Sequence, residues 1–77
     1  MSTTILRQLD LKGLSCPLPI IKTAQAIKEL PRGETVEILA TDPGSVPDFS
    51  EWCRWTGNEL IELSREDGVF RFVVRKR

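Results

Sequence analysis

The spacing of apolar residues changes repeatedly along this chain, and the order of these changes constrains the fold more than any other feature. Apolar and polar residues alternate over residues 4–10, apolar residues recur at helical spacing over about 17–30, and alternation returns over 34–41. A second helical stripe follows, and then two alternating segments joined by Asp67-Gly68, which is typical of a hairpin turn. The predicted order is strand, helix, strand, helix, strand, strand.

This order predicts an α/β (α+β) two-layer sandwich. The first strand–helix–strand unit favours parallel pairing of its two strands, whereas the hairpin makes the last two strands antiparallel. A mixed four-stranded sheet with both helices on one face would bury the apolar side of every element. Because the chain has only 77 residues, we predict a single domain over residues 1–77.

Periodicity also assigns side chains to faces. In the second strand, Val36, Ile38 and Ala40 are expected to face the helices. Helical spacing predicts a core stripe in the second helix and leaves Trp55 outside it, partly exposed. That stripe comprises Phe49, Trp52, Cys53 and Thr56. The sheet face away from the helices is expected to carry charged side chains that pair across strands, namely Arg7, Glu37, Glu62, Arg71 and Arg75.

The charge balance argues against direct binding to nucleic acid. Eleven Lys and Arg residues are balanced by 11 Asp and Glu residues, whereas sequence-independent attraction to nucleic acid needs an excess of basic residues. The terminal Arg75-Lys76-Arg77 is a local excess, interpreted as a solvated tail or, alternatively, a docking patch. The apolar runs are far shorter than a bilayer requires, and the N-terminus lacks the pattern of a signal peptide. We therefore expect a cytoplasmic protein with no membrane partner.

The inventory of reactive side chains is short. The chain has no histidine and two cysteines, Cys16 and Cys53, which are expected to be free thiols in a reducing compartment. Two cysteines without histidine do not make a zinc site, and neither a metal nor a cofactor is predicted. Since the commonest general base is absent, any chemistry must use Cys, Asp, Glu, Lys or Arg.

Cys16 lies at the turn between the first strand and the first helix, where Gly13, Pro17 and Pro19 surround it. The prolines are expected to stiffen the turn and hold the thiol in one direction. The thiolate is the reactive form of cysteine. Two features are expected to lower its pKa, namely the helix N-terminus, with N–H donors from residues 18, 20 and 21, and the nearby Lys12 and Lys22. The alternative is that Cys16 is a small buried residue preceding a helix.

The segment Leu9-Asp10-Leu11-Lys12-Gly13-Leu14-Ser15-Cys16-Pro17-Leu18-Pro19 resembles the signature of the TusA/SirA family of small sulfur-carrier proteins, whose defining element is a Cys-Pro-x-Pro motif at the start of the first helix. The resemblance extends over nearly the whole chain, including the Asp42-Pro43 turn, the second helix and the closing hairpin. It implies the two-layer fold predicted above.

The resemblance also implies a function. Cys16 would accept a sulfane sulfur as a persulfide from a donor such as a cysteine desulfurase or a rhodanese-like protein, and pass it to an acceptor protein. Pro17 and Pro19 would shape the loop, and Asp10 and Gly13 match the lead-in of the motif. Asp10 is expected to hold the loop through backbone N–H groups. The family serves tRNA thiolation, molybdenum-cofactor maturation and sulfur oxidation, so sulfurtransferase activity is implied.

Two alternatives stay open. Cys53 fits the core stripe of the second helix, but it could instead act as a second, resolving thiol that forms a disulfide with Cys16. The whole protein could be a regulatory or protein-interaction module that uses the motif turn as a docking surface. RNA binding is disfavoured, because the chain has no net positive charge and no aromatic stacking platform on its strands.

Overall fold

The structure, a computed structural model, describes residues 5–77, so the first residue of the predicted strand 4–10 lies outside the described residues. Six elements follow the predicted order of strands and helices. They are β1 (Ile5–Asp10), α1 (Leu18–Ile27), β2 (Thr35–Ala40), α2 (Ser45–Thr56), β3 (Glu59–Glu66) and β4 (Val69–Arg75).

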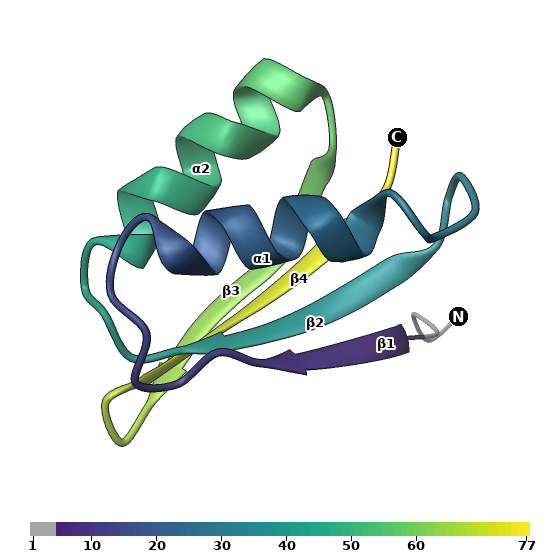
Figure 1. The fold of residues 1–77 in the computed structure, drawn as a ribbon. Helices are drawn as coiled ribbons and strands as arrows, with labels where there is room; N and C mark the ends of the chain where they lie inside the picture. The colour runs from purple at the N-terminus through teal and green to yellow at the C-terminus, as the bar shows by residue number, and fades with distance from the viewer. Residues whose placement is uncertain (1–4) are drawn as a thin grey trace.

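The strands form one mixed sheet in the order β1-β2-β4-β3. β1 and β2 are parallel, while β4 is antiparallel to both β2 and β3. Both helices lie on the same face of the sheet, and the other face is uncovered (Figure 1). The predicted two-layer α/β architecture is therefore confirmed.

The core lies between the helices and the sheet. Val36, Ile38 and Ala40 face the helices as predicted and are fully buried. From α2, Phe49 stacks on Phe72 of β4 with ring centroids 4.4 Å apart. These contacts fix α2, and the loop before it, against the sheet.

Both helices differ in detail from the prediction. α1 is shorter than the predicted 17–30, because the N–H groups of Glu29 and Leu30 bond the carbonyls three residues back in a tight turn before Pro31. In α2 the buried residues are spaced by four, at Ser45, Phe49 and Cys53.

The predicted core position of Thr56 is wrong. The helix ends at this residue before the stripe returns to the core, and the Thr56 hydroxyl donates instead to the carbonyl of Trp52. Trp52 itself is half-buried and lies edge-on to the ring of Phe49. Trp55 is more exposed than predicted, at 84%.

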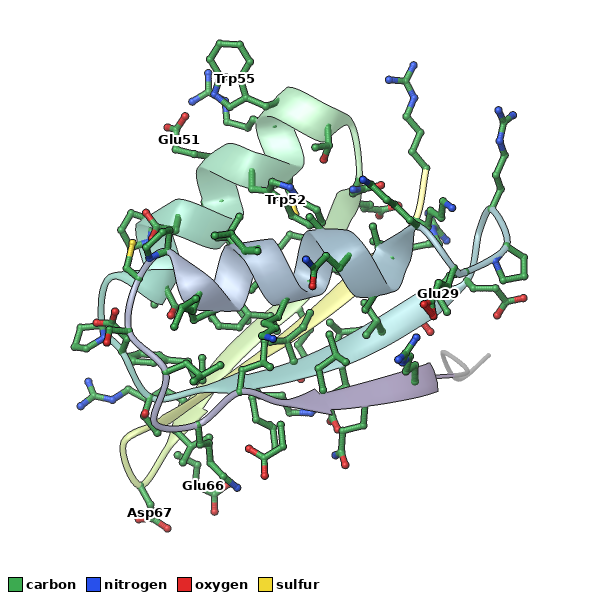
Figure 2. All side chains as sticks on the ribbon, viewed as in Figure 1. Glu29, Glu51, Trp52, Trp55, Glu66 and Asp67 are labelled. Atoms are coloured by element: carbon green, nitrogen blue, oxygen red, sulfur yellow. The ribbon has the colours of Figure 1, made fainter. Side chains whose placement is uncertain are left out.

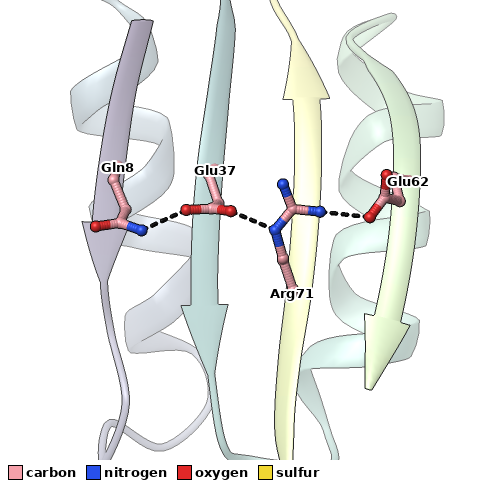
Figure 3. Close-up of polar contacts among 4 residues, drawn as sticks. All are labelled: Gln8, Glu37, Glu62 and Arg71. Atoms are coloured by element: carbon pink, nitrogen blue, oxygen red, sulfur yellow. Dashed lines mark hydrogen bonds and ion pairs between the residues drawn. The ribbon is translucent and has the colours of Figure 1, made fainter. Parts of the chain in front are cut away.

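The uncovered sheet face carries a row of paired side chains, the open-face row, formed by Gln8, Glu37, Arg71 and Glu62 (Figure 3). Gln8 and Arg71 both donate to the carboxylate of Glu37, and Arg71 also donates to Glu62. The predicted cross-strand pairing of charges is thus confirmed for these residues and for Arg75, which pairs with Glu59.

Arg7 is the exception to that prediction. It pairs in register with the core-facing Val36, so it lies on the helix side and forms an ion pair with Glu29. The reason is parity: Arg7 shares the face of Leu9, which packs against the core, and Gln8 therefore takes the open-face position.

The C-terminal residues are bound to the fold rather than forming a solvated tail. The Lys76 ammonium donates to the Leu30 carbonyl at 2.7 Å, and the Arg77 N–H donates to Asn58 Oδ1 at 2.9 Å. Lys76 therefore satisfies a carbonyl just beyond the C-terminal end of α1, opposite the end that follows Cys16.

The open-face row should make stability depend on pH. The hydrogen bonds from Gln8 and Arg71 hold the pKa of Glu37 below its usual value. The contribution of ionised Glu37 to folding stability is therefore complete above the pKa of about 4.3 that glutamate has in the unfolded chain. It is lost as the pH falls through the lower pKa of the folded state. We expect Glu37→Gln to reduce the free energy of unfolding by about 1 kcal/mol at neutral pH. In urea titrations, the difference from the wild type should close in acid; a difference that persists there would contradict this assignment.

Candidate functional site

Cys16 lies in the loop between β1 and α1, with its side chain exposed. The loop is fastened at two points before it reaches Cys16. The Asp10 carboxylate accepts a hydrogen bond from the N–H of Lys12 at 3.2 Å. Gly13, whose φ of +85° favours glycine, donates its N–H to Thr41 Oγ1 beyond β2 at 3.0 Å. The loop of Cys16 after β1 and the turn after β2 are thus bonded to each other at the carboxyl ends of the two parallel strands.

The prolines of the motif lie at the start of α1. Pro17 is the N-cap residue and Pro19 is buried in the first turn. The N–H groups of Leu18 and Ile21 donate to the carbonyls of Ser15 and Pro17, at 2.9 and 3.1 Å. The expectation that these two N–H groups would stabilise a sulfur anion is therefore wrong, because they are already used within the turn.

Two carboxylates from outside the Cys16 loop accept hydrogen bonds from Cys16. Its N–H donates to Asp42 Oδ2 at 2.7 Å, and its thiol donates to a carboxylate oxygen of Asp48 in the first turn of α2. Asp42 also accepts the N–H of Gly44 at 3.1 Å, and these two backbone donors lower the pKa of Asp42. Cys16 is thus fixed through both its backbone and its thiol.

These neighbours reverse the predicted electrostatics. The hydrogen bond to Asp48 raises the pKa of the Cys16 thiol, and partial desolvation and the charges of Asp48 and Asp42 raise it further. The predicted lowering by lysines is wrong, because Lys12 turns to Asp10, with Nζ 3.5 Å from a carboxylate oxygen. The resting thiol is therefore protonated at neutral pH.

Cys53 has a different environment. It is 6% exposed, within the core cluster, and burial raises the pKa of its thiol to about 11. Both cysteines are free thiols. These observations favour the interpretation of Cys53 as a core residue, since a resolving thiol must be accessible and ionisable.

Asp42 and Asp48 contact Cys16, but the sequence did not mark either of them as a site residue. Asp42 could have been found, because it follows β2, and the carboxyl ends of parallel strands meet at one edge of a sheet. Asp48 gave no comparable signal, since its distance from Cys16 depends on how α2 packs. Over residues 5–77, no group of three His, Cys, Asp or Glu side chains is placed to hold a metal ion. In the same range, no helix is long and apolar enough to cross a membrane.

Fold and site together define a class: small two-layer α/β proteins that present one exposed cysteine in a Cys-Pro-x-Pro turn before the first helix. The family model described as sulfurtransferase TusA matches residues 7–76. The chain therefore belongs to the TusA family.

Relatives over nearly the full length support this assignment. The chain is 43% identical to the sulfur carrier protein TusA of Allochromatium vinosum, over 91% of this chain and 92% of the relative. It is 47% identical to a putative sulfur carrier protein of Halobacterium salinarum, over 94% and 90% of the two chains. A solved SirA-like protein of Desulfitobacterium hafniense has the same fold, with a TM-score of 0.81 and 24% identity over 91% of this chain and 96% of that one. The names of the relatives support a sulfur-carrier role.

Proposed function

We propose that this protein carries sulfur as a persulfide on Cys16, and that residues 1–77 form a single domain for that purpose. The observation that carries the proposal is the exposed Cys16 thiol, held by Asp42 and Asp48 in a turn that is tied to both parallel strands. A thiol in this position is accessible to another protein's active site. Family membership supplies the chemical class of the cargo.

Loading and discharge are both sulfur-transfer displacements. In loading, the Cys16 thiolate attacks the outer sulfur of a donor persulfide, a new S–S bond forms, and the donor cysteine leaves as a thiolate. In discharge, an acceptor thiolate attacks the outer sulfur on Cys16, and Cys16 is the leaving thiolate. Each displacement uses one thiolate and releases one, so it needs neither an oxidant nor a reductant.

The remaining motif residues shape the turn. Pro17 and Pro19 fix the direction in which the chain enters α1, while Asp10 and Gly13 hold the start of the loop. None of these four carries the sulfur in this proposal. The donor is a persulfide-forming protein such as a cysteine desulfurase or a rhodanese-like protein, and the acceptor is a protein of tRNA thiolation, molybdenum-cofactor maturation or sulfur oxidation.

Intact mass measurement tests this function. The purified chain is incubated with a cysteine desulfurase and cysteine, and we expect a gain of one sulfur atom that a reducing agent removes. A rhodanese-like donor with thiosulfate provides a second source. If neither donor adds sulfur, persulfide transfer is wrong, and the interpretation as a regulatory or interaction module takes its place.

Trp55 is proposed as a contact for a protein partner. It is 84% exposed and projects from the outer side of α2, whereas Trp52 points toward α1 (Figure 2). Trp55 also lies seven residues after Asp48, which places both on one side of the helix. We expect Trp55→Ala to raise the KM for a protein donor several-fold, because exposed aromatic residues often anchor interfaces. The rate at which iodoacetamide alkylates Cys16 should be the same in Trp55→Ala as in the wild type. A KM for the protein donor that stays unchanged in Trp55→Ala would contradict the proposed contact.

A further inference from the structure

The Asp48 carboxylate is the structural feature that the transfer chemistry leaves unexplained. It accepts the hydrogen bond of the Cys16 thiol from a different element, the first turn of α2. A carboxylate stabilises the protonated thiol and repels the thiolate. Loading needs the thiolate as nucleophile and discharge needs it as leaving group, so this contact opposes both steps in the free protein.

The other charges around Cys16 do not offset Asp48. From the turn after β2, Asp42 adds a second negative charge. From the loop of Cys16 itself, Lys12 is paired with Asp10. On α1, Lys22 is exposed and contributes no shift to the thiol, and on α2 the Glu51 carboxylate is paired with Arg54 at 3.7 Å. The causes that act on the thiol all raise its pKa, which supports the geometric argument.

We propose that Asp48 is a specificity-determining residue: it keeps the Cys16 thiol unreactive toward small persulfides, and the Cys16 persulfide unreactive toward small thiols, until a partner protein pairs a Lys or Arg side chain with the Asp48 carboxylate. This inference rests on the proposed persulfide function. A cation at Asp48 would occupy the acceptor of the thiol hydrogen bond and cancel its charge, so that the thiolate becomes accessible only in the complex. In the free carrier, bound sulfur is then protected, because Cys16 is a poor leaving group there.

Three chains are compared: the wild type, Asp48→Asn and the matched control Glu51→Gln. Each variant removes one carboxylate from α2, but only Asp48 bonds Cys16. The rate of alkylation by iodoacetamide is measured against pH. In Asp48→Asn, we expect the curve of alkylation rate against pH to have its inflection at a lower pH, and alkylation at neutral pH to be several-fold faster. The curve of Glu51→Gln should follow that of the wild type.

Discharge is measured in the same three chains. Each is loaded with inorganic polysulfide, and the loss of sulfur to dithiothreitol is followed by intact mass. Asp48→Asn should lose its sulfur several-fold faster than the other two. The rate of loading is compared in the same way: Asp48→Asn should load faster than the wild type from inorganic polysulfide but at the wild-type rate from a cysteine desulfurase, because that partner already neutralises Asp48 in the wild type. A purely structural role of Asp48 would not lower the inflection pH.

Several outcomes would overturn the inference. One is an alkylation profile of Asp48→Asn whose inflection lies at the wild-type pH or above it. Another is a loading advantage of Asp48→Asn that is as large with the desulfurase as with polysulfide. If Asp48→Asn fails to fold by circular dichroism, Asp48→Ser replaces it with the same expected inflection. The alkylation profile needs no sulfur transfer, so it decides the role of Asp48 even if wild-type loading fails and the proposed function is wrong.

Discussion

Replacing Cys16 with alanine is expected to abolish the gain of sulfur from a desulfurase completely. The substitution removes the only exposed thiol among the described residues, and the other cysteine is buried. The fold should be unaffected, because the Cys16 side chain is exposed and its backbone N–H, which donates to Asp42, remains. Intact mass after incubation with the donor, with and without reductant, measures the effect.

Cys53→Ala is the matched control for this prediction. It removes the second thiol and should leave sulfur uptake unchanged, at a cost in stability of about 1 kcal/mol because the side chain lies in the core. Sulfur uptake by Cys16→Ala, or loss of uptake in Cys53→Ala alone, would assign the carrier role to Cys53. Uptake that needs both cysteines would instead support the resolving-thiol interpretation.

The fold was predictable from the sequence because each element is amphipathic on its own. Val36, Ile38 and Ala40 alternate with polar residues, and Asp67-Gly68 forms the predicted hairpin, so local patterns were sufficient for these elements. The position of β4 between β2 and β3 was not specified, since strand order depends on pairing between distant segments. The misplacement of Arg7 has a different origin, because strict alternation from Leu9, a local pattern, would have placed it on the helix side.

The site was predicted only in part, for a similar reason. Cys16 stands out through the motif and through the strand-to-helix turn, both of which are local. The lysines near it in sequence suggested an electropositive thiol, but a side chain four residues away can turn elsewhere, as Lys12 does toward Asp10. Asp48 is 32 residues from Cys16 and reaches it only through tertiary packing. The charge at the thiol therefore follows from how α2 is placed on the sheet.

Phe49→Ala is expected to have the largest effect on stability. Phe49 is fully buried, stacks on Phe72 and meets Trp52 edge-on at a centroid distance of 6.2 Å. Truncating a buried phenylalanine costs about 3–5 kcal/mol, which is a large part of the roughly 5–15 kcal/mol that stabilises a typical domain. Urea titration followed by circular dichroism should show a much lower midpoint with an unchanged slope.

Trp55→Ala provides the matched control, since it removes a larger aromatic side chain from the exposed side of the same helix. Its unfolding free energy should stay within about 0.5 kcal/mol of the wild type. An effect of Phe49→Ala as small as that of Trp55→Ala would mean that the contact between α2 and the sheet contributes little to stability. Because Asp48 immediately precedes Phe49 in α2, that contact also places the carboxylate at the Cys16 thiol. Loosening α2 should therefore lower the pH at which Cys16 becomes alkylated, toward that of Asp48→Asn.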